Sequence, residues 1–147
     1  MGGVSEGPAA EPLATHHAGL AVSDMDAAVA WFARHLGFRL EAEWTAGPTR
    51  LAMVGNGRAH LELFARPGAA PDADEGLEVM AHFDRRGWKH AAFAVSDLRA
   101  AVERLRDGGV AVLVEVAEAP PGYLYAFVEG PDRAALELVE TPPARDG

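Results

Sequence analysis

Residues 17–29, HAGLAVSDMDAAV, occur a second time in the chain as residues 90–102, HAAFAVSDLRAAV. Nine of the thirteen positions are identical, including the leading His and the Ser-Asp pair. Each copy is followed by the same short motif, Leu-Glu-Leu, at residues 61–63 after the first copy and at residues 136–138 after the second. One structural unit, with a His near its start and a Glu near its end, is therefore used twice.

Each copy has the pattern of a short strand that leads into a helix. The Ser-Asp pairs at 23–24 and 96–97 are helix N-cap signals, and glycines at 37 and 108–109 end the two helices. Between these signals, apolar residues recur at helical spacing. The expected buried faces consist of Met25, Val29, Phe32 and Leu36 in the first helix and Leu98, Val102 and Leu105 in the second.

Short apolar runs bounded by turn formers predict the strands. They are expected at 15–22, 38–44, 50–54 and 58–64 in the first unit, and at 88–95, 110–116, 123–128 and 134–140 in the second. Residues 77–83 fit a short strand or a short helix equally well. The order is thus β-α-β-β-β, twice. Units this short must pack on one another or on a second chain to bury their sheets.

The predicted organisation is one domain over residues 15–140, with module one at about 15–66 and module two at about 88–140. Residues 1–14 are rich in Gly, Pro, Ala and Glu and are expected to form a disordered leader. Residues 141–147 are expected to form a loose tail.

Composition excludes several classes of function. The net charge is −9 and only one of the thirteen basic residues is a Lys, so no basic surface for nucleic acid is expected. The absence of Cys excludes disulfides, thiolate nucleophiles and sulfur metal ligands. No signal peptide or membrane-spanning run is recognisable. We therefore expect a cytoplasmic protein that binds neither nucleic acid nor membrane.

Strand side chains alternate between the two faces of a sheet, which predicts where the repeated His and Glu residues point. The large apolar residues of each first strand belong under the helix, so His17 and His90 face away from it. Glu62 and Glu137 are flanked by leucines and face the same way. Two imidazoles and two carboxylates on one surface suit a divalent metal such as Fe, Co, Ni, Mn or Zn.

Other polar residues are candidates for the same surface. His60 shares the alternation of Glu62 and is a candidate pocket residue. Arg50, Tyr123 and Tyr125 are candidates for substrate binding, because a polar ligand needs hydrogen-bonding neighbours. For the two tyrosines, a place on a packed strand remains an equal alternative.

The three remaining histidines are expected to lie outside the site. His16 alternates with His17 and should point to the opposite face, so it is not expected to be a ligand. His35 and His82 are expected at the surface.

The segments HAGLAVSDMDAAVAWFARHLGF, HLELF, KHAAFAVSDLRAAVERLRDGGV and FVEGPDRAALELVE resemble the vicinal oxygen chelate superfamily. It includes glyoxalase I, methylmalonyl-CoA epimerase, extradiol dioxygenases, fosfomycin-resistance enzymes and bleomycin-binding proteins. The resemblance covers residues 15–140 and implies an α+β fold. Two βαβββ modules would form an open, cup-shaped mixed sheet around a metal, with the helices outside. The family's metal positions correspond to His17, Glu62, His90 and Glu137.

This set of four ligands resembles that of the glyoxalase and epimerase members. It implies a metal-dependent lyase or isomerase that acts on a small oxygenated substrate through an enolate stabilised by one divalent transition metal. Glu62 or Glu137 would act as the base. The alternatives are an Fe(II)-dependent ring-cleaving dioxygenase and a non-catalytic antibiotic-binding protein.

The resemblance also implies a homodimer, because family members often build the cup across two chains. A cup closed within one chain is equally compatible with the sequence.

Overall fold

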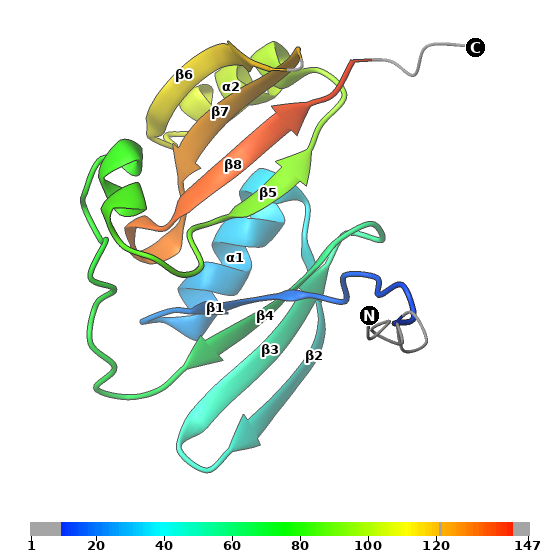
Figure 1. Cartoon of the computed structure of the whole chain (residues 1–147). Helices are drawn as coiled ribbons and strands as arrows, with labels where there is room; N and C mark the ends of the chain where they lie inside the picture. Colours follow the sequence, from blue (N-terminus) through cyan, green and yellow to red (C-terminus); the bar gives the residue numbers. More distant parts are fainter. Residues whose placement is uncertain (1–9, 121, 143–147) are drawn as a thin grey trace, which may run out of the picture.

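The computed structural model describes residues 10–120 and 122–142, which form two βαβββ modules (Figure 1). Each module has a four-stranded mixed sheet, with strand orders β1-β4-β3-β2 and β5-β8-β7-β6. In both, the first strand runs parallel to the last and the other pairs are antiparallel. The α+β class and the doubled βαβββ order are thereby confirmed. The leader and tail predicted from sequence lie largely outside the described residues.

The elements agree with the sequence-based boundaries to within a few residues. The strands of the first module are β1 (Ala18–Ala21), β2 (Arg39–Ala46), β3 (Thr49–Gly55) and β4 (His60–Ala65). Those of the second are β5 (Ala91–Ala94), β6 (Val112–Ala119), β7 (Tyr123–Glu129) and β8 (Ala135–Glu140). The helices are α1 (Met25–Leu36), α2 (Leu98–Asp107) and two 3-10 helices, η1 (Val79–Asp84) and η2 (Pro131–Arg133).

The predicted helix signals act as caps. Asp24 accepts a hydrogen bond from the backbone N–H of Ala27, and Asp97 does the same for Ala100. Gly37 ends α1 with φ of 70°, a left-handed conformation that glycine adopts without steric cost. No helix within the described ranges is long and apolar enough to cross a membrane.

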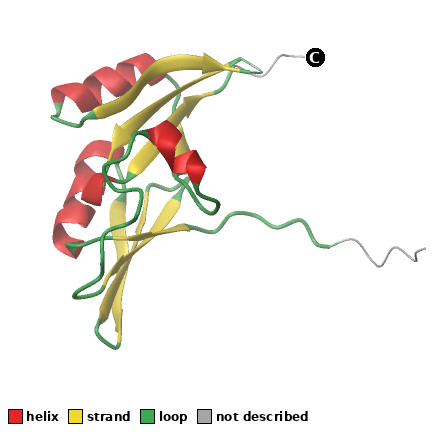
Figure 2. Cartoon of the chain, turned by 60° about the vertical axis from the view of Figure 1, so that its left-hand side comes forward, coloured by secondary structure: helices red, strands yellow, loops and turns green. Residues whose placement is uncertain are grey.

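One apolar cluster contains buried residues of both modules and joins them. Phe32 of α1, Leu63 of β4, Leu105 of α2 and Leu138 of β8 are all fully buried in one cluster. α1 and α2 lie on the same side of the sheets, which leaves the opposite faces without a long helix (Figure 2). Because the core is continuous, neither module is packed independently of the other.

Aromatic and polar contacts hold the modules together. Phe38 lies edge-on to Phe93 of the second module, with ring centroids 5.4 Å apart. Asp132, in the turn before β8, accepts a hydrogen bond of 2.8 Å from the backbone N–H of Ser23 at the start of α1. Asp132 and Arg133 have φ of 54° and 59°, which is costly for residues with a Cβ. The contact with Ser23 helps to hold this turn.

Residues 77–83, which fitted a strand or a helix, contain most of η1. This 3-10 helix lies on the side of the second sheet opposite to α1 and α2 (Figure 2). Val79 of η1 packs against Phe127 and Ala135. The expectation that His82 lies at the surface is wrong. His82 is 6% exposed, and its Nε2 lies 3.2 Å from the carbonyl oxygen of Leu77. Its burial goes with the packing of η1 on the sheet through Val79.

We expect Asp132→Ala to lower the free energy of unfolding by about 1–2 kcal/mol, through loss of the hydrogen bond to Ser23 and added strain at positive φ. Asp132→Asn keeps an acceptor and tolerates this backbone conformation, so its loss should be smaller. Urea unfolding at fixed protein concentration measures both. Equal losses for the two variants would show that the hydrogen bond does not hold the turn.

Candidate metal centre

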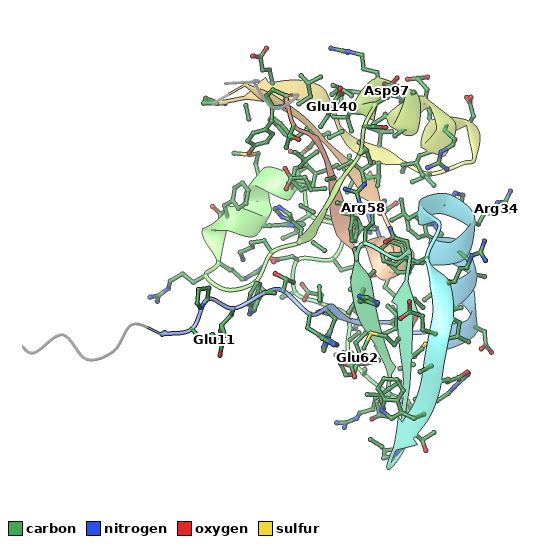
Figure 3. The ribbon with its side chains drawn as sticks, turned by 90° about the vertical axis from the view of Figure 1, so that its right-hand side faces the viewer. Glu11, Arg34, Arg58, Glu62, Asp97 and Glu140 are labelled. Carbon is green, nitrogen blue, oxygen red and sulfur yellow. The ribbon has the colours of Figure 1, made fainter. Side chains whose placement is uncertain are left out.

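The first module brings His17 and Glu62 together. His17 immediately precedes β1, and Glu62 lies on β4 in register with Gly19. His17 Nε2 is 2.8 Å from Glu62 Oε2. Figure 3 shows Glu62 on the side of its sheet opposite to α1. A Cβ at Gly19 would lie 3.0 Å from Cε2 of Phe64, so glycine at this position leaves room for the Phe64 ring.

The second module repeats the arrangement. His90 immediately precedes β5, and its Nε2 is 2.9 Å from Oε2 of Glu137 on β8. The His90 ring also lies edge-on to Phe127, with centroids 4.8 Å apart. The side chains of His90 and Glu137 are 20% and 15% exposed, so this pair is well shielded from solvent.

The flanking leucines explain why both glutamates face away from the helices. Leu61 and Leu63 are buried in the core beneath α1, and Leu136 and Leu138 are buried in the same core. Since successive side chains of a strand point to opposite faces, the residue between each leucine pair must lie on the helix-free face. The strand alternation expected from the sequence is therefore observed.

The donor atoms of each pair are placed as neighbouring ligands of one metal would be. Metal–nitrogen and metal–oxygen bonds of about 2.0–2.1 Å at a right angle leave the donor atoms about 2.9 Å apart. The observed separations are 2.8 and 2.9 Å. Imidazole and carboxylate donors also suit a divalent transition metal. Both pairs therefore fit a metal, and they equally satisfy a hydrogen bond when no metal is bound.

The two pairs do not combine within one chain. Over residues 10–120 and 122–142, no three His, Cys, Asp or Glu side chains lie close enough to hold a metal ion together. Each module therefore supplies two donors, and two donors leave most of a metal's coordination positions open. The four residues expected to act together form two separate half-sites, which we define as His17–Glu62 and His90–Glu137.

One nitrogen of the second half-site is unsatisfied. His90 Nδ1 is buried and has no hydrogen-bond partner among the side chains and backbone that the structure describes. A buried polar atom without a partner costs about 1–3 kcal/mol. This arrangement is poor for stability alone, which is common where a side chain is retained for function.

Arg50 does not lie with the half-sites. Its guanidinium donates hydrogen bonds to Glu43 and to Asp26 of α1, on the helical face of the first sheet. The hydrogen bond to Glu43, and to a smaller extent the one to Asp26, raises the pKa of the Arg50 guanidinium. Arg50 shares this face with Ala52 and Val54, which are buried in the core. The expectation that Arg50 lines the cup is corrected, because the strand alternation puts it on the opposite face from Glu62.

The other substrate-binding candidates lie on the helix-free faces. Tyr125 packs beside Phe127, which pairs in register with Glu137. By strand alternation Tyr123 and Tyr125 therefore share the face of Glu137, a question that the sequence left open. His60 pairs with Glu41 at 3.2 Å on the face of Glu62.

Two residues lie near the first half-site although the sequence did not predict them there: Glu41 was not a candidate, and His16 was expected on the opposite face. Glu41 lies at a register irregularity between Leu40 and Ala42, so its side chain departs from simple alternation. His16 was expected to point away from His17, yet the two Nδ1 atoms are 2.7 Å apart. His16 precedes β1, where strand alternation no longer applies. The sequence carries no signal for either placement.

Comparisons with known proteins agree with this architecture. Residues 14–138 match the family described as "Glyoxalase/Bleomycin resistance protein/Dioxygenase superfamily". A "Probable lactoylglutathione lyase" of Synechocystis sp. is 29% identical over 137 residues, covering 88% of this chain and 97% of that protein. The protein YwkD of Bacillus subtilis is 28% identical over 128 residues, covering 85% and 94%. The crystal structure of SMU.1112c superposes with a TM-score of 0.71 at 28% identity, covering 88% and 100%.

The second half-site should be replaceable by apolar residues without loss of stability. In metal-free protein we expect Glu137→Leu alone to lower the free energy of unfolding by about 1–3 kcal/mol, because His90 then has no partner at either nitrogen. The double variant His90→Leu, Glu137→Leu should lie within about 1 kcal/mol of the wild type or above it. Urea unfolding in the presence of chelator tests both. A double variant that loses as much as Glu137→Leu would refute this.

Proposed function

Since this chain belongs to the Glyoxalase/Bleomycin resistance protein/Dioxygenase superfamily, we propose that it is a divalent-metal-dependent lyase or isomerase of the glyoxalase type. The observation that carries the proposal is the same His–Glu donor pair built twice, with separations of 2.8 and 2.9 Å. The likeness to the probable lactoylglutathione lyase of Synechocystis supports this class of reaction. The proposed substrate is a small molecule with a proton next to a carbonyl group.

The chemistry divides between the bound ion and the four side chains. A divalent metal held by these donors would act as a Lewis acid that stabilises negative charge developing on a substrate oxygen. The imidazoles of His17 and His90 and the carboxylates of Glu62 and Glu137 would hold this ion beside the substrate. A carboxylate in this position can accept the proton from the carbon next to the carbonyl and return it. Glu62 and Glu137 are the two candidates for this base.

We further infer that two chains complete the site, with the His17–Glu62 half-site of one chain facing the His90–Glu137 half-site of its partner. The separation of the half-sites within a chain supports this pairing. Apolar side chains near the second half-site also remain uncovered in the single chain. Trp88, two residues before His90, is fully exposed, and Met80 and Phe83 of η1 are 72% and 54% exposed. Exposed apolar groups of this size favour a protein interface.

Metal content is the direct test of the proposed function. Protein purified without chelator or affinity nickel should carry about one divalent transition metal per chain, held by nitrogen and oxygen donors. His90→Ala should lose this metal, whereas His35→Ala, outside both half-sites, should retain it. Elemental mass spectrometry measures both.

Each other outcome of the metal measurement has a defined meaning. Wild-type protein without metal, and with none taken up on addition, would exclude the proposed function and favour the antibiotic-binding alternative. Bound iron together with oxygen consumption on catechols would favour the dioxygenase alternative.

The pairing of half-sites across two chains can be tested by complementation. One variant carries His17→Ala and Glu62→Gln, and the other carries His90→Ala and Glu137→Gln. Neither homodimer should bind Co²⁺ tightly, because every site lacks two donors. The heterodimer, isolated with two affinity tags, should bind about one Co²⁺ per two chains, because one of its sites keeps all four donors. A heterodimer that binds none would place each site within a single chain.

A further inference from the structure

A second group of polar side chains adjoins the first half-site. The His16 ring packs edge-on to His17, with their Nδ1 atoms 2.7 Å apart. The other side of His16 is stacked on His60, with centroids 6.2 Å apart and an interplanar angle of 18°. His60 Nε2 in turn lies 3.2 Å from Glu41 Oε2. These contacts form a continuous row from Glu41 through His60 and His16 to His17.

The backbone makes room for this row. Glu41 reaches His60 because the register of β2 shifts between Leu40 and Ala42. Gly55 lies beside both side chains, and a Cβ there would clash with Glu41 Oε1 and lie 2.8 Å from His60 Cδ2. The φ of Gly55 is not positive, so its backbone conformation does not require glycine. What glycine supplies at this position is space for the Glu41–His60 pair.

The row has no counterpart in the second module. The residue before His90 is Lys89, whose ammonium group lies 3.8 Å from Asp74 Oδ2. The residue equivalent to His60 is Ala135. The second half-site therefore keeps the His–Glu pair without this support, and His90 Nδ1 has no partner within the described residues.

The chemistry of imidazole gives the row a role at the proposed metal site. A neutral His that offers its Nε2 lone pair to a metal carries its proton on Nδ1. That N–H needs an acceptor, and such second partners orient metal-bound histidines. Resting on the function proposed above, we propose that His16 is a positioning residue for His17. When a metal occupies His17 Nε2, the Nδ1 of His16 accepts the hydrogen bond from His17 Nδ1–H. Stacking on the Glu41–His60 pair holds the His16 ring in place.

The test is Co²⁺ affinity, measured on chelator-stripped protein by competition with a chromophoric chelator. His16→Ala should weaken Co²⁺ binding by about 10- to 100-fold. His16→Asn should restore most of the affinity, because its amide oxygen can accept the same hydrogen bond. Lys89→Ala, at the equivalent position of the second module, should bind Co²⁺ as the wild type does. His16 is exposed, so the urea unfolding midpoint of the metal-free protein should not change.

The outcomes separate this inference from the proposed function. If the wild type binds no Co²⁺, both the metal site and the role of His16 are excluded. If the wild type binds Co²⁺ and His16→Ala binds it within twofold, only the positioning role is excluded. Equal weakening in His16→Ala and His16→Asn would also overturn it, because the hydrogen-bond acceptor would then be irrelevant.

Discussion

The leucines on either side of Glu62 and Glu137 impose the constraint on which the whole site depends. Their burial under the helices fixes which face of β4 and β8 carries the glutamate, because successive residues of a strand point to opposite faces. The parallel pairing of β1 with β4, and of β5 with β8, then brings the preceding His beside each Glu. The same strand register therefore buries the leucines and exposes the metal donors, and a shift of one residue would bury both carboxylates.

The two half-sites share this arrangement but differ in their surroundings. The first is supported by a row of polar side chains, and Gly55 leaves the space that the row needs. The second is packed against Phe127 and sits on the sheet that η1 partly covers. The apolar residues that pack under the helices recur in both units, whereas the neighbours of the His–Glu pair on the other face differ. The difference between His16 and Lys89 lies in this second group.

The junction between the modules combines a strong apolar contact with a strained turn. Phe38, which is buried, and Phe93, which is partly buried, join the two halves of the core, and burial of apolar side chains of this size is stabilising. The turn at Asp132 and Arg133 adopts positive φ twice and is tied to Ser23 by a single hydrogen bond. The favourable packing of the core compensates for the backbone strain, and the turn fixes where β8 begins and hence where Glu137 lies.

Local chemistry determined much of this protein from sequence alone. The repeat, the capping aspartates and the alternation around the leucines specified two βαβββ modules and placed His17 with Glu62 and His90 with Glu137, because each feature depends on residues close in sequence or on strand alternation. Contacts between distant segments were decided only in the tertiary structure. Arg50 turned toward Asp26, His82 became buried as part of η1, and Glu41 and His16 came to lie beside the first half-site. The separation of the two half-sites within one chain is also a tertiary property, because it depends on how the modules pack through their shared core.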